Sequence, residues 1–373
     1  MLLALPDNAL VRVLALLLPR EFFSLRLRLV CRRLRDLCLH PNVWRSIRLR
    51  GGHKGLLKAT LRLAPCLHKI YLPSSNLQAA ACAISNTKCV VTKLALAVQT
   101  EFEAAWATAM VLKFSTLAGF RKISPDLFRG ATDALPPLLR MVNSVQDLRV
   151  LRVWGYSDAE LPPSLWSDLE PRPSLTKLKY EYAPSPFLCL LLETHAATLE
   201  EVVLFVDELP TSRLGMMPRL RSLTCRPSGD LSQLKKLSSL ETLELYGFPE
   251  KNMCFPGAEE FLLQGPSLRS VSFDSESYCR VPSSSLLRAL AKSPSTPVLE
   301  RLSLRCVEDL PVAAALQRFS SAKTVTTMAQ VIQRNKHHFV TRLPRFEPPA
   351  GHGVRTHRHY IGRCVSMKRL LLK

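Results

Sequence analysis

The chain has 373 residues, of which 47% are hydrophobic and 22% are charged. This composition is typical of a globular protein with room for one large domain or two to three ordinary ones. No stretch approaches the roughly 18 consecutive apolar residues of a membrane span, and the apolar start, interrupted by Asp7 and Arg12, is unlike a secretory signal. The eleven cysteines include no Cys-x-x-Cys pair. Free thiols in a reducing compartment, and hence a cytoplasmic or nuclear protein, are therefore expected.

The formal net charge of +21 is concentrated at the two ends of the chain. Residues 1–70 hold 14 Lys and Arg against three acids, and residues 322–373 hold 11 against Glu347 alone. The residues between are balanced, with 26 charges of each sign. One basic face for nucleic acid would require the two ends to meet. We therefore expect solvated helix faces and a basic loop, with neither nucleic acid nor membrane as a partner.

The first fifty residues predict a short helical domain. Pro6 and Asp7 suit a first helical turn, where a missing N–H is tolerated and a negative charge is favourable. The apolar residues that follow have the i, i+3, i+4, i+7 spacing of a helix with one buried face. They are Leu10, Val13, Leu14 and Leu17. Pro19 ends this helix and opens a second one through residues 22–25.

A third helix is expected next. Its apolar side is formed by Val30, Leu34 and Leu37, and its basic side by Arg32, Arg33 and Arg35. Pro41 stops this helix, and Trp44 supplies a large apolar anchor. Some forty residues cannot easily bury enough surface to stand alone. The segment should therefore bury part of its apolar surface against something else.

These features, in this order, resemble the F-box, the module through which F-box proteins dock on the Skp adaptor of cullin–RING ubiquitin ligases. The matching positions are Leu5, Pro6, Leu10, Leu14, Leu17, Pro19, Val30, Cys31, Arg32, Arg33, Pro41 and Trp44. Two features depart from the family pattern. Leu34 stands where the family usually has Trp, and residues 25–29 hold one Arg-Leu unit more than usual.

The resemblance implies contact with the Skp adaptor and, through it, with a cullin scaffold. The residues it implies for the adaptor contact are Leu5, Pro6, Leu10, Leu14, Leu17, Pro19, Val30, Cys31 and Trp44. The alternative is an ordinary helical cap on the domain that follows.

From Trp44 onward, an apolar-x-x-apolar-x-apolar pattern recurs about every two dozen residues, which indicates an internal repeat. Its units start at Trp44, Leu67, Val91, Leu148, Leu175, Leu199, Leu220, Leu240, Leu268, Leu299 and Met367. The long gap before Leu148 would hold one degenerate unit near Phe120 and Ile123. Runs compatible with helices lie between the triplets, at residues 77–85, 101–118, 186–195, 257–264 and 284–291.

Strand, turn and helix at this period resemble the leucine-rich repeats found in some F-box proteins. The positions that carry Asn or Cys in regular repeats differ here, so irregular turns are expected; a stack of helical hairpins is the alternative. The predicted fold is α/β: a three-helix F-box, residues 1–50, followed by an irregular leucine-rich-repeat solenoid, residues 51–310. Parallel strands would form its concave face and helices its convex face.

Because side chains alternate along a strand, the residues between and after each buried pair should project from the sheet. Aromatic residues together with Arg are characteristic of interaction hot spots. The candidate target-binding residues are Arg152, Trp154, Lys179, Phe205, Arg226, Tyr246 and Arg305. The alternative is that a helix, loop or tail covers the aromatic residues among them.

Two further segments complete the chain. Residues 311–366 are expected to form a helical stretch, over 311–335, followed by a basic insertion that bears Pro, Gly and His. Its histidines have no spacing that matches a metal site, so no metal is expected. Residues 367–373 would be a final repeat strand. An uncapped repeat end predicts either that the sequence is a fragment or that another segment covers this strand.

No catalytic constellation is apparent: the phosphate-binding and nucleophile motifs are absent, and so is any cofactor signature. The resemblance therefore implies a non-catalytic subunit that recognises substrates for a Skp–cullin–F-box ubiquitin ligase, leading to ubiquitination and degradation of a target protein. Two alternatives remain. One is a repeat scaffold whose F-box-like segment is a cap or binds another partner, and the other is a nucleic-acid-associated factor that uses the basic ends.

Overall fold

The computed structural model describes residues 4–17, 30–50, 54–128, 135–155, 172–181, 185–206, 208–247, 255–274, 284–305 and 324–327. The chain divides into two compact units, Met1–Ala329 and Gln330–Lys373, and every described residue belongs to the first.

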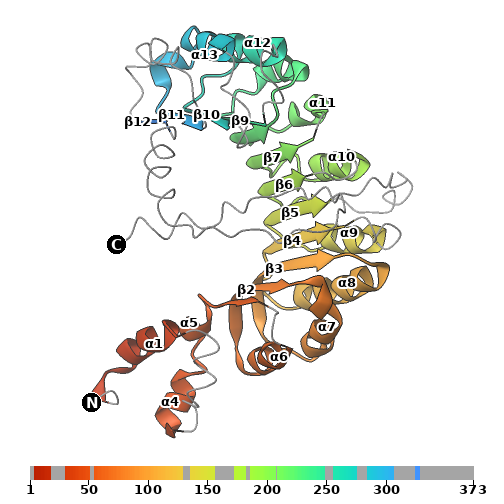
Figure 1. The fold of residues 1–373 in the computed structure, drawn as a ribbon, viewed down its shortest axis with the longest axis vertical. Helices are drawn as coiled ribbons and strands as arrows, with labels where there is room; N and C mark the ends of the chain where they lie inside the picture. Colours follow the sequence, from red (N-terminus) through yellow and green to blue (C-terminus); the bar gives the residue numbers. More distant parts are fainter. Residues whose placement is uncertain are drawn as a thin grey trace, which may run out of the picture. The chain divides into compact units, whose positions relative to one another are not determined.

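The described N-terminal part is helical (Figure 1). Helix α1 (Asp7–Ala15) begins after Pro6, and α4 (Arg32–Leu37) and α5 (Pro41–Trp44) follow. The predicted second helix, over residues 22–25, lies outside the described residues. The predicted buried stripe of α1 is only partly right, since its buried residues are Leu10, Val11 and Leu14. Val13 is 40% exposed, because the core contacts the neighbouring side of the helix.

Twelve strands of the described residues form one sheet in which the spatial order follows the sequence order. They are β1 (Arg48–Arg50), β2 (Cys66–Leu72), β3 (Val90–Val98), β4 (Lys122–Leu127), β5 (Val150–Gly155), β6 (Lys177–Glu181), β7 (Glu201–Phe205), β8 (Ser222–Cys225), β9 (Thr242–Tyr246), β10 (Ser270–Asp274), β11 (Arg301–Arg305) and β12 (Thr324–Thr327). Every neighbouring pair is parallel. The chain therefore returns to the same edge of the sheet after each strand, as a repeat fold requires.

The connecting helices lie on one side of this sheet (Figure 1). They are α6 (Lys54–Leu63), η2 (Ser74–Asn76), α7 (Leu77–Ser85), α8 (Glu101–Ser115), α9 (Leu135–Asn143), α10 (Ser185–Thr194), α11 (Thr211–Leu214), η5 (Gly229–Lys236), α12 (Pro256–Gln264), α13 (Ser284–Ala291) and η6 (Thr296–Val298). Where the connection is short, as before β8 and β9, a single turn or a 3-10 helix replaces the longer helix. None of the described helices combines the length and hydrophobicity of a membrane span.

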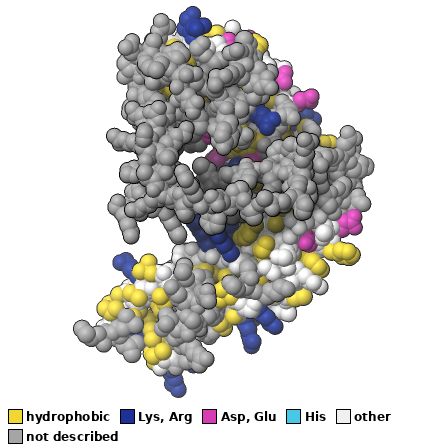
Figure 2. Space-filling view, viewed as in Figure 1, with side chains coloured by type: hydrophobic (Ala, Val, Ile, Leu, Met, Phe, Trp, Pro, Cys, Tyr) yellow, Lys and Arg dark blue, Asp and Glu magenta, His cyan; other side chains and the backbone are white. Residues whose placement is uncertain are grey.

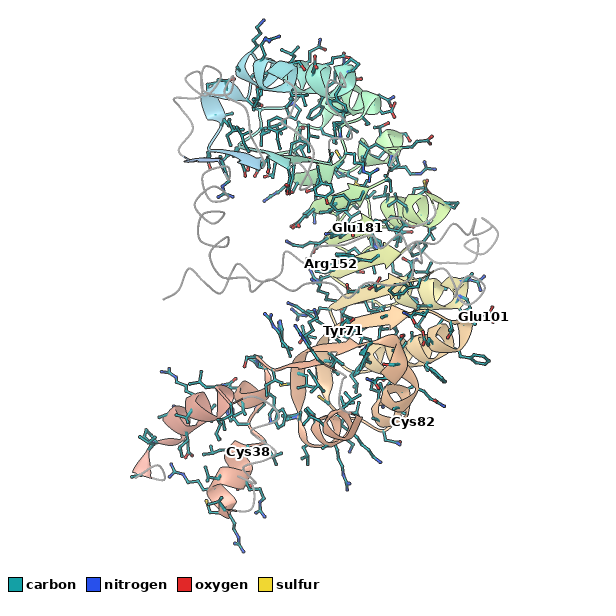
Figure 3. All side chains as sticks on the ribbon, in the orientation of Figure 1. Cys38, Tyr71, Cys82, Glu101, Arg152 and Glu181 are labelled. Carbon is teal, nitrogen blue, oxygen red and sulfur yellow. The ribbon has the colours of Figure 1, made fainter. Side chains whose placement is uncertain are left out.

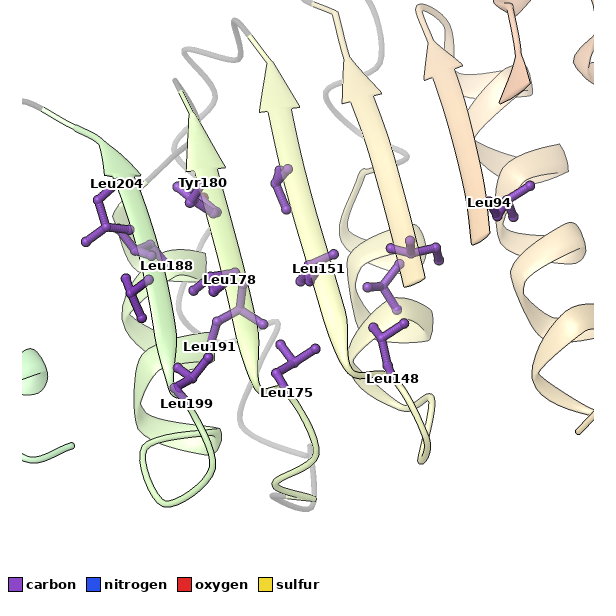
Figure 4. Close-up of a cluster of buried hydrophobic side chains, with 14 of the residues drawn as sticks. Leu94, Leu148, Leu151, Leu175, Leu178, Tyr180, Leu188, Leu191, Leu199 and Leu204 are labelled. Carbon is purple, nitrogen blue, oxygen red and sulfur yellow. The ribbon is translucent and has the colours of Figure 1, made fainter. Parts of the chain in front are cut away.

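The core lies between the sheet and these helices (Figure 4). The strand register places one apolar residue of each strand in a continuous row. The row runs Leu49, Ile70, Leu94, Ile123, Leu151, Leu178, Val202, Leu223, Leu243, Val271, Leu302 and Val325. All members from Leu49 to Leu302 are at most 2% exposed. Each unit therefore buries its apolar residue only by stacking on its neighbours.

The α/β fold class predicted from the sequence is confirmed, with helical N-terminal residues followed by parallel strand–helix units. The degenerate unit expected near Phe120 and Ile123 is present as β4. The helical prediction for residues 311–335 is wrong at Thr324–Thr327, which form β12. These four residues are all β-branched and therefore favour the extended backbone. The rest of residues 306–366 and the final triplet at 367–373 lie outside the described residues.

Candidate protein-interaction surfaces

The side of the sheet that faces away from the helices, here called the strand face, carries the alternate residues of each strand. On β5, Leu151 and Val153 are fully buried in the core, whereas Arg152 and Trp154 are exposed. Tyr71, Arg152 and Glu181 lie on the strand face, and Cys82 and Glu101 lie on the helical side (Figure 3). The period-2 alternation of the sequence therefore predicts correctly which strand residues leave the core.

Four of the seven predicted target-binding residues are brought together on the strand face. This aromatic cluster consists of Trp154, Lys179, Phe205 and Tyr246. The Lys179 ammonium lies 4.8 Å from the Trp154 ring centre and 5.1 Å from that of Phe205. It also pairs with a Glu181 carboxylate oxygen at 2.8 Å. These contacts hold Lys179 between the two rings and orient the Trp154 indole.

Phe205 differs from the expectation that it would be exposed. It is only 8% exposed, although its strand position points it away from the core. Its ring contacts Tyr246 edge-on, with 4.5 Å between ring centres, and Lys179 lies over it. The aromatic surface available to a partner is thus mainly that of Trp154, which is 41% exposed.

The other predicted target-binding residues lie on three different strands or strand ends. Arg152 is in register with Lys179. Arg226 packs beside Gly247, whose added Cβ would lie 3.7 Å from the Arg226 Nε. Arg305 is the last residue of β11, in register with Asp274, and its side chain is outside the described residues.

Sequence reasoning missed two charged residues of β4. Burial, and then the charges of four neighbouring cations, lower the pKa of Lys122 to about 8. Burial, and then the Glu181 carboxylate, raise the pKa of Asp126, which lies in register with Trp154. Both residues belong to the degenerate unit, in which Pro125 breaks the repeat pattern. Only alignment of β4 with its neighbours could have revealed them.

The residues predicted to contact the Skp adaptor occupy different environments. Leu10, Leu14 and Trp44 are buried in the core of the chain itself. These three side chains support the helical segment and leave little surface for a partner. Leu17 and Cys31 are half-buried, whereas Leu5, Pro6 and Val30 are exposed, and Pro19 lies outside the described residues.

Polar contacts hold these helices together. The Arg33 guanidinium pairs with the Asp7 carboxylate at 2.6 Å and donates to the Leu5 carbonyl oxygen at 2.7 Å, which joins α4 to the start of α1. The Trp44 indole N–H donates to the Cys38 carbonyl oxygen at 2.6 Å. The buried ring is therefore fixed within the helical segment.

The same segment exposes further apolar side chains: Leu16 and Leu39, which sequence reasoning did not single out, and Val13, which it expected to be buried. Val13, Leu16 and Leu39 join Leu5 and Val30 as exposed large apolar residues; Leu16 is 83% and Val30 61% exposed. An exposed apolar group in so short a segment suggests a surface that another protein covers. The sequence signal for this surface was that α1 carries apolar residues, Val13 and Leu16, on a side other than the buried one.

The described residues include few groups with metal-binding or thiol chemistry. No group of three or more His, Cys, Asp or Glu that could hold a metal ion is found among them. The seven described cysteines are free thiols, as the sequence predicts. Burial raises the pKa of the Cys89 and Cys225 thiols, each to about 12, so neither is a ready nucleophile.

The fold and these surfaces define a repeat protein with a strand face and an apolar helical surface. Comparison with known proteins adds a family for the first part: residues 2–50 match the family model described as F-box-like. No curated protein matches the chain. The chain thus carries an N-terminal F-box-like domain, followed by an all-parallel strand–helix repeat region consistent with leucine-rich repeats.

Proposed function

We propose that this chain is the substrate-recognition subunit of a Skp–cullin–F-box ubiquitin ligase. The F-box-like domain binds the Skp adaptor and thereby the cullin scaffold, and the strand face holds a target protein for ubiquitination and degradation. The chain itself is non-catalytic in this role: it raises the effective concentration of the target and orients it toward subunits that transfer ubiquitin.

The observation that carries this proposal is the F-box-like match over residues 2–50. It is supported by the exposed apolar side chains of the same segment, which offer a partner the surface that a folded chain would otherwise bury. On the strand face, Trp154 beside Arg152 has the composition of an interaction hot spot.

The test is co-purification of the adaptor and a cullin with the tagged full-length chain. Val13→Asp with Leu16→Asp places two charges on the exposed apolar side of α1, where they should repel an apolar partner surface. We expect at least a tenfold loss of adaptor recovery. The matched control is Leu112→Asp with Met216→Asp, which alters two exposed apolar residues, 52% and 72% exposed, in the repeats.

The control should leave adaptor recovery unchanged, and both variants should unfold at the temperature of the wild type. Failure of the folded wild-type chain to recover either adaptor or cullin would exclude the ligase role.

A second candidate function is a non-ligase scaffold in which the F-box-like domain serves as a structural cap. It is favoured by one observation: Trp44, Ile47 and Leu49 belong to the same hydrophobic cluster as the repeats. If the domain is only a cap, Val13→Asp with Leu16→Asp would change neither the recovery of the adaptor nor the binding of a target.

A further inference from the structure

The strand face carries a row of cations across its first four strands. The register aligns Arg48 on β1 with Lys69 on β2, Lys93 on β3 and Lys122 on β4. Neighbouring strands are about 4.8 Å apart, so the row spans about 14 Å. Arg50 and Arg152 lie on the adjacent positions of β1 and β5. These six residues are here called the basic patch: Arg48, Arg50, Lys69, Lys93, Lys122 and Arg152.

The charges of the patch act on one another. Burial, and then the charges of Arg48, Arg152, Lys93 and Arg50, lower the pKa of Lys69. Burial, and then the charges of Arg152, Lys93, Lys69 and Lys177, do the same at Lys122. The pKa of His68 is lowered by burial and by four cations nearby. Lys and Arg side chains come together on this side of the sheet, near the middle of the view in Figure 2.

Within the part of the chain that the structure describes, no carboxylate lies within ion-pairing distance of any of the six side chains. The next strand is different, because Lys177 pairs with Glu201 and Lys179 pairs with Glu181. Carboxylates therefore neutralise lysine side chains elsewhere on this face. None of the described carboxylates does so at the basic patch.

The fold does not require cations at these positions. The same row continues on β8, β9 and β10 as Ser222, Thr242 and Ser270. Like charges directly opposite each other on a sheet are destabilising. A row of uncompensated lysines thus costs stability that short polar side chains would not cost, which points to a role in binding.

We propose that the basic patch binds a segment of the target protein in which Asp and Glu side chains are clustered. This proposal rests on the proposed function, since it names the chemistry of the target. An extended segment of about five residues matches the length of the row. Trp154 lies two residues after Arg152 on β5 and offers an apolar contact at the end of the patch.

A nucleic acid fits this face less well. A polyanion that continued along the sheet past β5 would meet Glu181, Glu201, Glu244 and Asp274 on the strand face. The cationic row is therefore short and bounded, whereas nucleic-acid surfaces present a longer continuous track of positive charge. A short acidic segment can pair with the row without reaching these carboxylates.

The experiment measures binding of a fluorescein-labelled octaglutamate peptide to the full-length chain by fluorescence polarisation at low salt. Substitution of Lys69, Lys93 and Lys122 by Ser should lower the affinity at least tenfold. The matched control replaces Lys58, Lys88 and Lys113 by Ser, which removes the same charge outside the strand face. The control should change affinity less than twofold.

The folded state is checked by thermal unfolding. The triple variant, Lys69→Ser with Lys93→Ser and Lys122→Ser, should unfold at the wild-type temperature or higher, because it relieves repulsion between the lysine side chains. If the triple variant fails to fold, Lys93→Ser alone should still lower peptide affinity about threefold, and no change in that single variant would overturn the proposal.

Other outcomes also decide the question. Equal losses of peptide affinity in the triple variant and the control variant would mean that the peptide is attracted by the net charge of the protein alone. That result would overturn the proposal. An octauridine probe that binds more tightly than the peptide, with the same dependence on the three lysines, would make nucleic acid the ligand of the patch instead of an acidic segment.

A segment of this chain is another possible occupant, because residues 156–171 carry four acids and no Lys or Arg. A tenfold gain in peptide affinity on neutralising them would make that segment the occupant.

Adaptor recovery, measured on the same protein preparations, separates this proposal from the proposed function. Peptide binding that depends on the three lysines, in a chain that recovers no adaptor, would support the patch and exclude the ligase role. Adaptor recovery with peptide binding that is insensitive to the three lysines would overturn the patch alone.

Discussion

At the scale of single residues, His195 shows how the irregular turns between units are held. Its ring is buried just after α10, where Nδ1 accepts a hydrogen bond from the Ser174 backbone N–H at 3.2 Å. The other ring nitrogen, Nε2, lies 3.3 Å from the Asn143 Oδ1 at the end of α9. Nε2 therefore carries the proton, and a neutral imidazole joins two repeat units. The buried polar groups at this junction are thereby satisfied by one side chain.

This arrangement predicts a pH-dependent stability. Burial lowers the pKa of His195 to about 4, whereas an unfolded His titrates near about 6.5. The unfolded state binds more protons between these values, so the stabilisation is complete above about 6.5 and is lost as the pH falls toward about 4. Between pH 7 and pH 5 we expect the free energy of unfolding to fall by about 2 kcal/mol on this account.

The measurement is urea unfolding, followed by circular dichroism, at pH 7 and pH 5. His195→Gln keeps a donor and an acceptor but cannot titrate, so its unfolding midpoint should fall less than that of the wild type. Equal falls in the two proteins would contradict the assignment of a neutral, buried His195.

At the scale of elements, the backbones of α12 and η5 approach each other closely. A Cβ built on Gly257 would lie 1.8 Å from the Gly229 carbonyl oxygen. No side-chain movement can relieve such a contact, because the neighbouring atom belongs to the backbone. The 3-10 helix and the following helix pack at a distance that only glycine permits.

We therefore predict that Gly257→Ala destabilises the protein by about 3 kcal/mol, the upper part of the range for overpacking. Gly55→Ala is the matched control, since nothing lies within 4 Å of the Cβ it would add in α6. That change should leave the free energy of unfolding unchanged or raise it by up to about 1 kcal/mol. Thermal unfolding of both variants is the measurement, and an equal effect of the two would refute the close packing.

Several elements could be predicted from the sequence because their signal is local. Helix α7 spans the predicted residues 77–85, and α13 spans 284–291, since each is a run of residues compatible with a helix between two apolar triplets. Strand β12 was missed because its four residues carry no Leu triplet, and only pairing with β11 reveals it. The burial of Phe205 was missed for the same reason: Tyr246, two strands away, covers the ring.

The site was predictable to a smaller extent. Alternation along each strand places Arg152, Trp154 and Lys179 on the strand face correctly. The row that joins Lys69, Lys93 and Lys122 depends on the register between strands that are more than twenty residues apart. The exposed side of α1 depends on which side the core contacts, and this follows from the packing of α5 rather than from the α1 sequence.

At the scale of the whole molecule, one sheet and one core run from the F-box-like domain into the repeats. Strand β1 ends that domain and pairs with β2, with Leu49 in register with Ile70. Trp44 and Ile47 belong to the same hydrophobic cluster. The F-box-like domain therefore covers the first edge of the sheet, where open backbone and apolar side chains would otherwise be exposed.

This continuity predicts that deletion of residues 1–50 destabilises the repeats. The deletion removes β1 and uncovers Ile70 and Leu67, which are at most 1% exposed in the full chain. We expect a lower unfolding temperature and self-association through the open edge of β2, measured by thermal unfolding and by light scattering after size-exclusion chromatography. The comparison is the full-length chain with Val13→Asp and Leu16→Asp, which changes the exposed apolar side of α1 but leaves β1 in place. That variant should remain monomeric and unfold at the wild-type temperature. A monomeric deletion variant of unchanged stability would instead mean that the F-box-like domain and the repeats fold independently, with β1 contributing little to either.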